Sequence, residues 1–149
     1  MVDPQGAGCA EPGLGVLLGR VQGKLARAAA QALVPFGVDA HEVAVLGALS
    51  GDEALSQAEA AGRVGVDRST MSALIDGLED HGLVERRRSA LDRRKNIVRL
   101  TPAGRECLVS ADAARCAAER RFLAPLDEDT AAALLRALRL LTGESDTHG

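Results

Sequence analysis

The chain has 149 residues, of which 46% are hydrophobic, and its 18 Lys and Arg against 21 Asp and Glu make it formally acidic. This composition is sufficient for one ordinary hydrophobic core and excludes a disordered chain. Two Phe and no Tyr or Trp leave almost no aromatic surface on which unpaired bases could stack, which argues against single-stranded nucleic acid as a partner.

The two ends of the chain are predicted to be flexible tails. Residues 1–13 are rich in Gly and Pro and lack the basic start and apolar run of a secretory signal, and residues 143–149 are polar. No uncharged apolar run approaches the roughly 18 residues that would suggest a membrane span. We therefore expect residues 14–142 to form a single domain of a soluble, cytoplasmic protein that has no membrane partner.

Cysteines and histidines are too scattered to predict a disulfide or a metal site. Cys9, Cys107 and Cys116 form no CxxC pair, and their number is odd. None of them lies at metal-ligand spacing from another or from the three histidines, which are His41, His81 and His148. Because the chain also shows no convergent set of nucleophile and base, the sequence predicts neither a cofactor nor enzymatic activity.

The first third of the chain is predicted to be helical. Apolar residues recur at steps of three or four from Leu14 to Val34, which is typical of a long amphipathic helix, and Pro35 ends it. Asp39, with Glu42 three residues later, forms a capping-box pattern that begins a short and nearly all-apolar helix. Such a helix is expected to be buried on most sides.

A helix-turn-helix is predicted next. Ser56 with Glu59 is a second capping-box pattern, and Asp67 begins another helix only two residues after Gly65 ends the first. One face of this later helix is apolar, and the residues expected to point outward are Ser69, Thr70, Ser72, Ala73, Asp76 and Gly77. A helix with such short outward side chains can come close to another surface.

A cationic hairpin follows the helix-turn-helix. The β-prone runs LVERR and NIVRL predict a hairpin over residues 83–100, with a projecting loop of about eight residues. Six of the 18 positive charges lie within residues 86–95. Because repulsion among neighbouring cations is costly at low salt, the pattern favours a polyanion as partner, and duplex DNA is such a polyanion.

The chain is predicted to end in two helices. Thr101 and Pro102 are an N-cap and first-turn pair that begins a long helix through about Leu123. Asp127 caps the last helix, which carries a stripe of leucines. The predicted fold class is therefore mainly α with a small β-hairpin wing, arranged as a winged helix-turn-helix between flanking helices.

Four motifs lie in order between residues 64 and 104. They are D-R-S-T at 67–70, G-L-V-E-R-R at 82–87, D-x-R at Asp92 and Arg94, and L-T-P-x-G at 100–104. This run resembles the signature of the MarR family of bacterial transcriptional regulators. The resemblance implies a winged helix over residues 39–101 between dimerisation helices at 14–38 and 102–142. It also implies a homodimer that represses transcription by binding a pseudo-palindromic operator in double-stranded DNA.

The resemblance also implies how DNA is bound. The recognition helix would enter the major groove, Arg94 of the wing would enter the minor groove, and Asp92 would hold the neighbouring arginine in position. Ala73 and Gly77 depart from the family, because relatives often carry Arg at these outward positions, so we expect the wing to supply more of the affinity. The residues expected to contact DNA are Arg68, Ser69, Thr70, Ser72, Arg86, Arg88, Asp92, Arg93, Arg94 and Lys95.

A small organic anion is the effector that the resemblance implies, bound between the dimerisation helices and the winged helix. Arg20, Lys24 and His41 are the candidate contacts, with an ordinary surface role for each as the alternative. Redox sensing through Cys9 is an alternative mechanism, although Cys9 lies in a Gly-rich tail and the chain has no Tyr to support it. A winged helix that binds another protein is a further alternative, which the missing helix arginines permit and the intact wing opposes.

Overall fold

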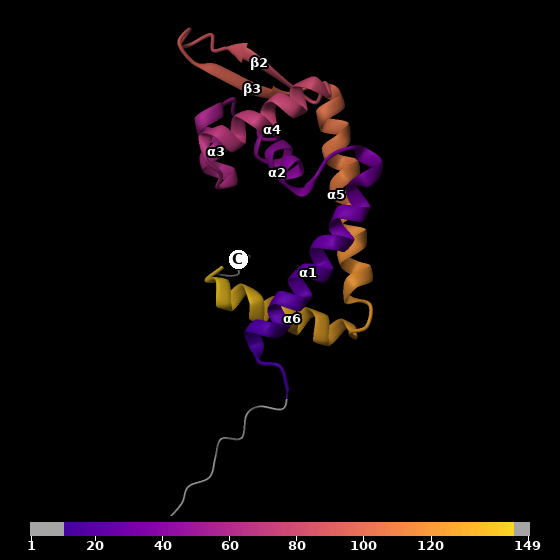
Figure 1. Cartoon of the computed structure of the whole chain (residues 1–149). Helices are drawn as coiled ribbons and strands as arrows, with labels where there is room; N and C mark the ends of the chain where they lie inside the picture. The colour runs from indigo at the N-terminus through magenta and orange to yellow at the C-terminus, as the bar shows by residue number, and fades with distance from the viewer. Residues whose placement is uncertain (1–10, 145–149) are drawn as a thin grey trace, which may run out of the picture.

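Two long helices lie side by side in the computed structural model, which describes residues 11–144, and they carry the winged helix at one end (Figure 1). These helices are α1 (Leu14–Leu33) and α5 (Pro102–Leu123), and we call them the stalk. The last helix, α6 (Glu128–Thr142), follows a short turn at the other end of the stalk. The predicted tails fall mostly outside the described residues.

The predicted helix starts are confirmed. After a 3-10 turn at Val34–Phe36, Asp39 and Glu42 form a complete capping box at the start of α2 (Ala40–Ala48), with both N–H···O distances 2.8 Å. Side chains also cap the four later helices, and these caps are Ser56 for α3 (Gln57–Val64), Asp67 for α4 (Arg68–Asp80), Thr101 for α5 and Asp127 for α6. Short-range sequence patterns therefore determine where these helices begin.

The wing is a hairpin with a third, very short strand beside it. β2 (Val84–Arg88) pairs antiparallel with β3 (Asn96–Leu100), so the predicted hairpin is confirmed. β1 (Leu55–Ser56) pairs with the other edge of β3. The sequence did not predict β1, because two residues are too few to show alternation. The three strands form a small sheet that packs against the helix-turn-helix.

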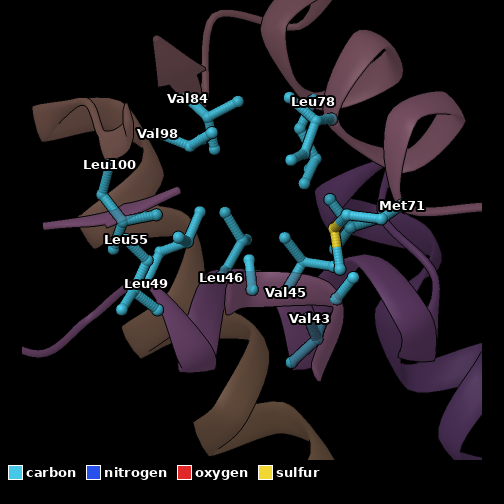
Figure 2. Packing of buried hydrophobic residues seen from close by; sticks show 14 of the residues in the cluster. Val43, Val45, Leu46, Leu49, Leu55, Met71, Leu78, Val84, Val98 and Leu100 are labelled. Atoms are coloured by element: carbon cyan, nitrogen blue, oxygen red, sulfur yellow. The ribbon is translucent and has the colours of Figure 1, made fainter. Parts of the chain in front are cut away.

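The hydrophobic core lies within the winged helix. Val45 and Leu46 of α2 point into a space closed by Met71 and Leu78 of α4 and by residues of the sheet (Figure 2). The buried residues of the sheet are Leu55, Val84, Val98 and Leu100. The prediction that α2 is buried on most sides is only partly right, because Val43, Val45 and Leu46 are buried whereas Ala40, His41, Ala44 and Gly47 are exposed. This core fixes α4 and the sheet relative to one another.

Much of the stalk and most of α6 keep their apolar side chains exposed. Leu14 is 68% exposed, and none of the residues of α6 is buried. The other large apolar side chains exposed on α1 and α6 are Val16, Leu17, Leu18, Val21, Leu134, Leu135, Leu140 and Leu141. Apolar surface of this extent is typical of a surface that another chain covers. No helix within residues 11–144 is long and apolar enough to cross a membrane.

Candidate nucleic-acid interface

Arg68 and Thr70 are two of the four predicted DNA contacts of α4, and both are exposed. Asp67 Oδ1 accepts hydrogen bonds from the Thr70 amide at 2.7 Å and from the Ser69 hydroxyl at 2.8 Å, and these bonds lower the pKa of Asp67 below its ordinary value. The cap is therefore charged at neutral pH and already engages Ser69, while Ser72 is half-buried.

Gly77 is less exposed than its expected outward position implies. A Cβ at Gly77 would lie 3.6 Å from Glu42 Oε1 of α2, and the residue is half-buried. The capping box at the start of α2 holds Glu42 against this face of α4. Ala73 is exposed, as expected. Of the two positions that depart from the family, Ala73 is thus exposed and Gly77 is half-buried.

The six cations of residues 86–95 divide into two groups. Arg86 forms ion pairs with Asp76 and Glu79 of α4, and Arg87 forms one with Glu85. No ion pair joins the others to any residue within 11–144, and these are Arg88, Arg93, Arg94 and Lys95. All four are exposed. Residues 86–95 therefore keep four positive charges without an ion-pair partner among the described residues, in a chain whose net charge is −3.

The loop of the wing is ordered by hydrogen bonds to its backbone. Asp92 Oδ1 accepts from the Arg94 amide at 3.0 Å, and the Asp92 carbonyl accepts from the Lys95 amide at 3.0 Å. The Ser89 hydroxyl accepts from the amides of Leu91 and Asp92, both at 3.3 Å. In the described residues, Asp92 thus holds Arg94 through its main chain and forms no ion pair with a guanidinium.

A groove of about 510 Å³ joins the wing to the helix-turn-helix. It brings Arg68 of α4 together with Lys95 of the wing, and its other lining residues are Ser56, Gln57, Ala58, Glu59 and Asn96. The hydrogen bond from the Ser56 amide is the main cause that lowers the pKa of Glu59, and Lys95 lowers it further. Sequence reasoning missed Gln57 and Asn96, although Gln57 directly follows a helix N-cap, where backbone amides favour phosphate.

The predicted effector contacts come together only in part. Arg20 and Lys24 line a hollow of about 480 Å³ along α1, together with Leu17, Val21 and Arg27. His41 is exposed in the first turn of α2 and does not line this hollow. Two cations beside apolar side chains suit a small organic acid, whereas His41 lies apart from them.

Cys107 is a poor candidate for a reactive thiol. Burial is the main cause that raises the pKa of the half-buried Cys107 thiol, and Glu42 raises it further. A raised pKa disfavours the thiolate, which is the form that reacts with oxidants. Cys107 and Cys116 are both free, as their spacing predicted. Cys9, the candidate for redox sensing, lies outside the described residues.

Known proteins share both the sequence and the fold of this chain. The model of the MarR family matches residues 36–95. The HTH-type transcriptional repressor Rv2887 of Mycobacterium tuberculosis is 37% identical over 113 residues, which cover 76% of this chain and 81% of that repressor. The chain belongs to the MarR family. The resemblance seen in residues 64–104 is thereby confirmed, and this MarR-family chain is a transcriptional regulator and not an enzyme.

Solved structures of the MarR family confirm the winged-helix fold class. The structure of Rv2887 in complex with DNA has a TM-score of 0.75 and 33% identity, covering 88% of this chain and 98% of that one. The structure of Rv2887 in complex with salicylic acid has a TM-score of 0.71 and 34% identity, covering 89% and 98%.

Proposed function

We propose that this MarR-family chain is a cytoplasmic repressor that binds a pseudo-palindromic operator in duplex DNA as a homodimer. The observation that carries the proposal is the set of four exposed cations in residues 88–95 that form no ion pair within residues 11–144, beside the exposed start of α4. Duplex DNA supplies the matching density of negative charge. The complex of the similar Rv2887 with DNA supports the same function.

The two parts of the interface have different tasks in this proposal. Arg68 and Thr70 at the start of α4 contact the major groove, with Ser69 and Ser72 beside them. Arg94 enters the minor groove, where arginine responds to groove width. The remaining wing cations contact phosphates, and these are Arg88, Arg93 and Lys95. Residues 39–101 are thus the DNA-binding unit.

The exposed apolar residues of α1 and α6 support the homodimer. They lie on the helices outside the core, within the proposed dimerisation segments 14–38 and 102–142. A second copy of the chain would cover them and give the protein two winged helices. Two-fold symmetry then sets two half-sites about one helical turn apart on the operator.

Duplex binding should weaken steeply with salt. If Arg88, Arg93 and Lys95 of both subunits contact phosphate, the logarithm of the binding constant should fall with the logarithm of salt concentration with a slope of about −5. Fluorescence anisotropy with a duplex selected by the protein from a random pool measures this slope. Arg63→Gln is the control, because Arg63 is paired with Glu53 and should leave the slope unchanged. A protein that retained no duplex at low salt would refute the proposal.

We also propose that a small organic acid releases the protein from DNA by binding against Arg20 and Lys24. The similar Rv2887 has been solved with salicylic acid, so salicylate is the probe of choice. Salicylate should weaken duplex binding by the wild-type protein and have at least about tenfold less effect on the Arg20→Gln/Lys24→Gln variant, since each charge-assisted hydrogen bond that is removed is worth about 1.5–3 kcal/mol. His41→Gln is the matched control. An equal response of both variants to salicylate would place the ligand elsewhere.

A further inference from the structure

Arg86 differs from the unpaired cations of the wing in its surroundings. Its side chain is only 25% exposed, and its guanidinium reaches two carboxylates of α4. Nη2 lies 2.5 Å from Asp76 Oδ1, and Nη1 lies 3.3 Å from Glu79 Oε1. Because both acids belong to the recognition helix, one side chain joins that helix to the first strand of the wing.

The strand register explains why Arg86 faces α4. Arg86 is paired with Val98 of β3, and both Val84 and Val98 are buried in the core. Since alternate residues of a strand share one face, Arg86 lies on the same face of the sheet as Val84. Asp76 and Glu79 are three residues apart and so lie on one side of α4. The ion pairs of Arg86 therefore follow from the register of the wing strands and from the position of α4, and they do not involve the loop at the tip of the wing.

A planar guanidinium held at two nitrogens fixes direction as well as distance. We propose that Arg86 is a positioning residue, which sets the orientation of the wing relative to α4 and does not itself contact DNA. The inference rests on the proposed function and deepens it. Arg68 must reach the major groove while Arg94 reaches the minor groove, so the angle between helix and wing determines whether both residues reach DNA together.

Two duplexes and one matched control separate positioning from direct binding of phosphate. Arg88 lies two residues further along the same strand, is exposed, and has no ion pair within residues 11–144. Arg86→Gln should weaken binding to the selected duplex at least about tenfold. It should leave binding to an unselected duplex and the salt slope nearly unchanged. Arg88→Gln should weaken binding to both duplexes and flatten the slope by about 0.9 for each phosphate that the variant no longer neutralises.

A double-mutant cycle tests whether Arg86 acts through its two carboxylates. In the Asp76→Asn/Glu79→Gln background, Arg86→Gln should cause no further loss of affinity for the selected duplex, because the ion pairs of Arg86 are already absent. Arg86→Lys keeps the charge but cannot form the planar two-point pairing, so it should restore less than half of the discrimination between the duplexes. Far-UV circular dichroism and thermal melting check that each variant is folded at the assay temperature.

The outcomes separate this inference from the proposed function. A wild-type protein that binds no duplex refutes the proposed function. If the wild type binds, any one of three results would overturn the role of Arg86. The first is a flatter salt slope for Arg86→Gln, and the second is an equal loss of affinity when Arg86→Gln is made in the Asp76→Asn/Glu79→Gln background. The third is an Arg86→Gln variant that melts at a lower temperature but still distinguishes the selected from the unselected duplex as well as the wild type does. If Arg86→Gln does not fold, the Asp76→Asn/Glu79→Gln variant tests the same ion pairs by changing α4 instead of the wing. It should reduce the discrimination between the selected and unselected duplexes to the extent expected for Arg86→Gln.

Discussion

Replacing Arg94 with alanine should weaken binding to the operator more than any other single change in the wing. Arg94 is exposed and unpaired within residues 11–144, and the turn that presents it is held by backbone hydrogen bonds to Ser89 and Asp92. A specific arginine contact is worth about 1–3 kcal/mol. Two copies of Arg94 in the proposed dimer therefore predict a loss of about 2–6 kcal/mol, or at least about thirtyfold. Anisotropy titrations measure the loss, and an effect under about threefold would remove Arg94 from the minor groove.

Substitutions at Asp92 provide the control for this prediction. Because Asp92 Oδ1 accepts from the Arg94 backbone amide, an asparagine can take its place with the same acceptor atom. Asp92→Asn should therefore bind the operator at least as tightly as the wild type, since it also removes a negative charge beside phosphates. Asp92→Ala should weaken binding, because the turn loses its acceptor. If Asn proved as damaging as Ala, the carboxylate charge would be the essential feature.

Replacing Gly104 with alanine should have the largest effect on stability. An added Cβ would lie 2.0 Å from the carbonyl oxygen of Leu83 and 3.0 Å from its carbonyl carbon. Movement of the Leu83 carbonyl would disturb two hydrogen bonds, because this carbonyl accepts from the Thr101 amide at 3.1 Å and the Thr101 hydroxyl donates to the adjacent Gly82 carbonyl at 2.6 Å. We expect a loss of about 3 kcal/mol or more in the free energy of unfolding. Thermal melting should show this as a decrease of about 10 °C in Tm.

Gly62→Ala is the matched control for Gly104→Ala. Gly62 also lies within a helix, but nothing lies within 4 Å of the position of its absent Cβ. Alanine is favoured over glycine inside a helix by about 1 kcal/mol, so this variant should be slightly more stable than the wild type. If Gly104→Ala melted within about 2 °C of the wild type, where about 10 °C is expected, the close approach of α5 to Leu83 would not constrain the fold.

The sequence predicted those features that depend on near neighbours. Each helix cap joins residues three apart, so patterns such as Asp39 with Glu42 identify the helix starts directly. The hairpin was equally predictable, because two β-prone runs surround a charged loop. The order of the helices then follows from these starts, and the four motifs of residues 64–104 identify the family.

Features that depend on how the helices and strands pack could not be predicted from the sequence. The pairing of Arg86 with Asp76 and Glu79 requires the register of β2 against β3 and the docking of α4 on the same face of the sheet. The approach of Gly77 to Glu42 depends likewise on where α2 crosses α4. The sequence did not distinguish among the six cations of residues 86–95, whereas the structure pairs Arg86 and Arg87 with carboxylates and leaves the other four without an ion pair within residues 11–144.

Because α5 is attached to the wing at one end and is long, a small tilt of this helix produces a large displacement at its end. Its first turn is fixed to the base of the wing by Thr101 and Gly104, and its 22 residues extend for about 33 Å along α1 toward α6. A tilt of about 5° over that length displaces one end relative to the other by about 3 Å. A ligand that bound beside the stalk and tilted α5 by this small angle would therefore move the wing by about the length of a hydrogen bond.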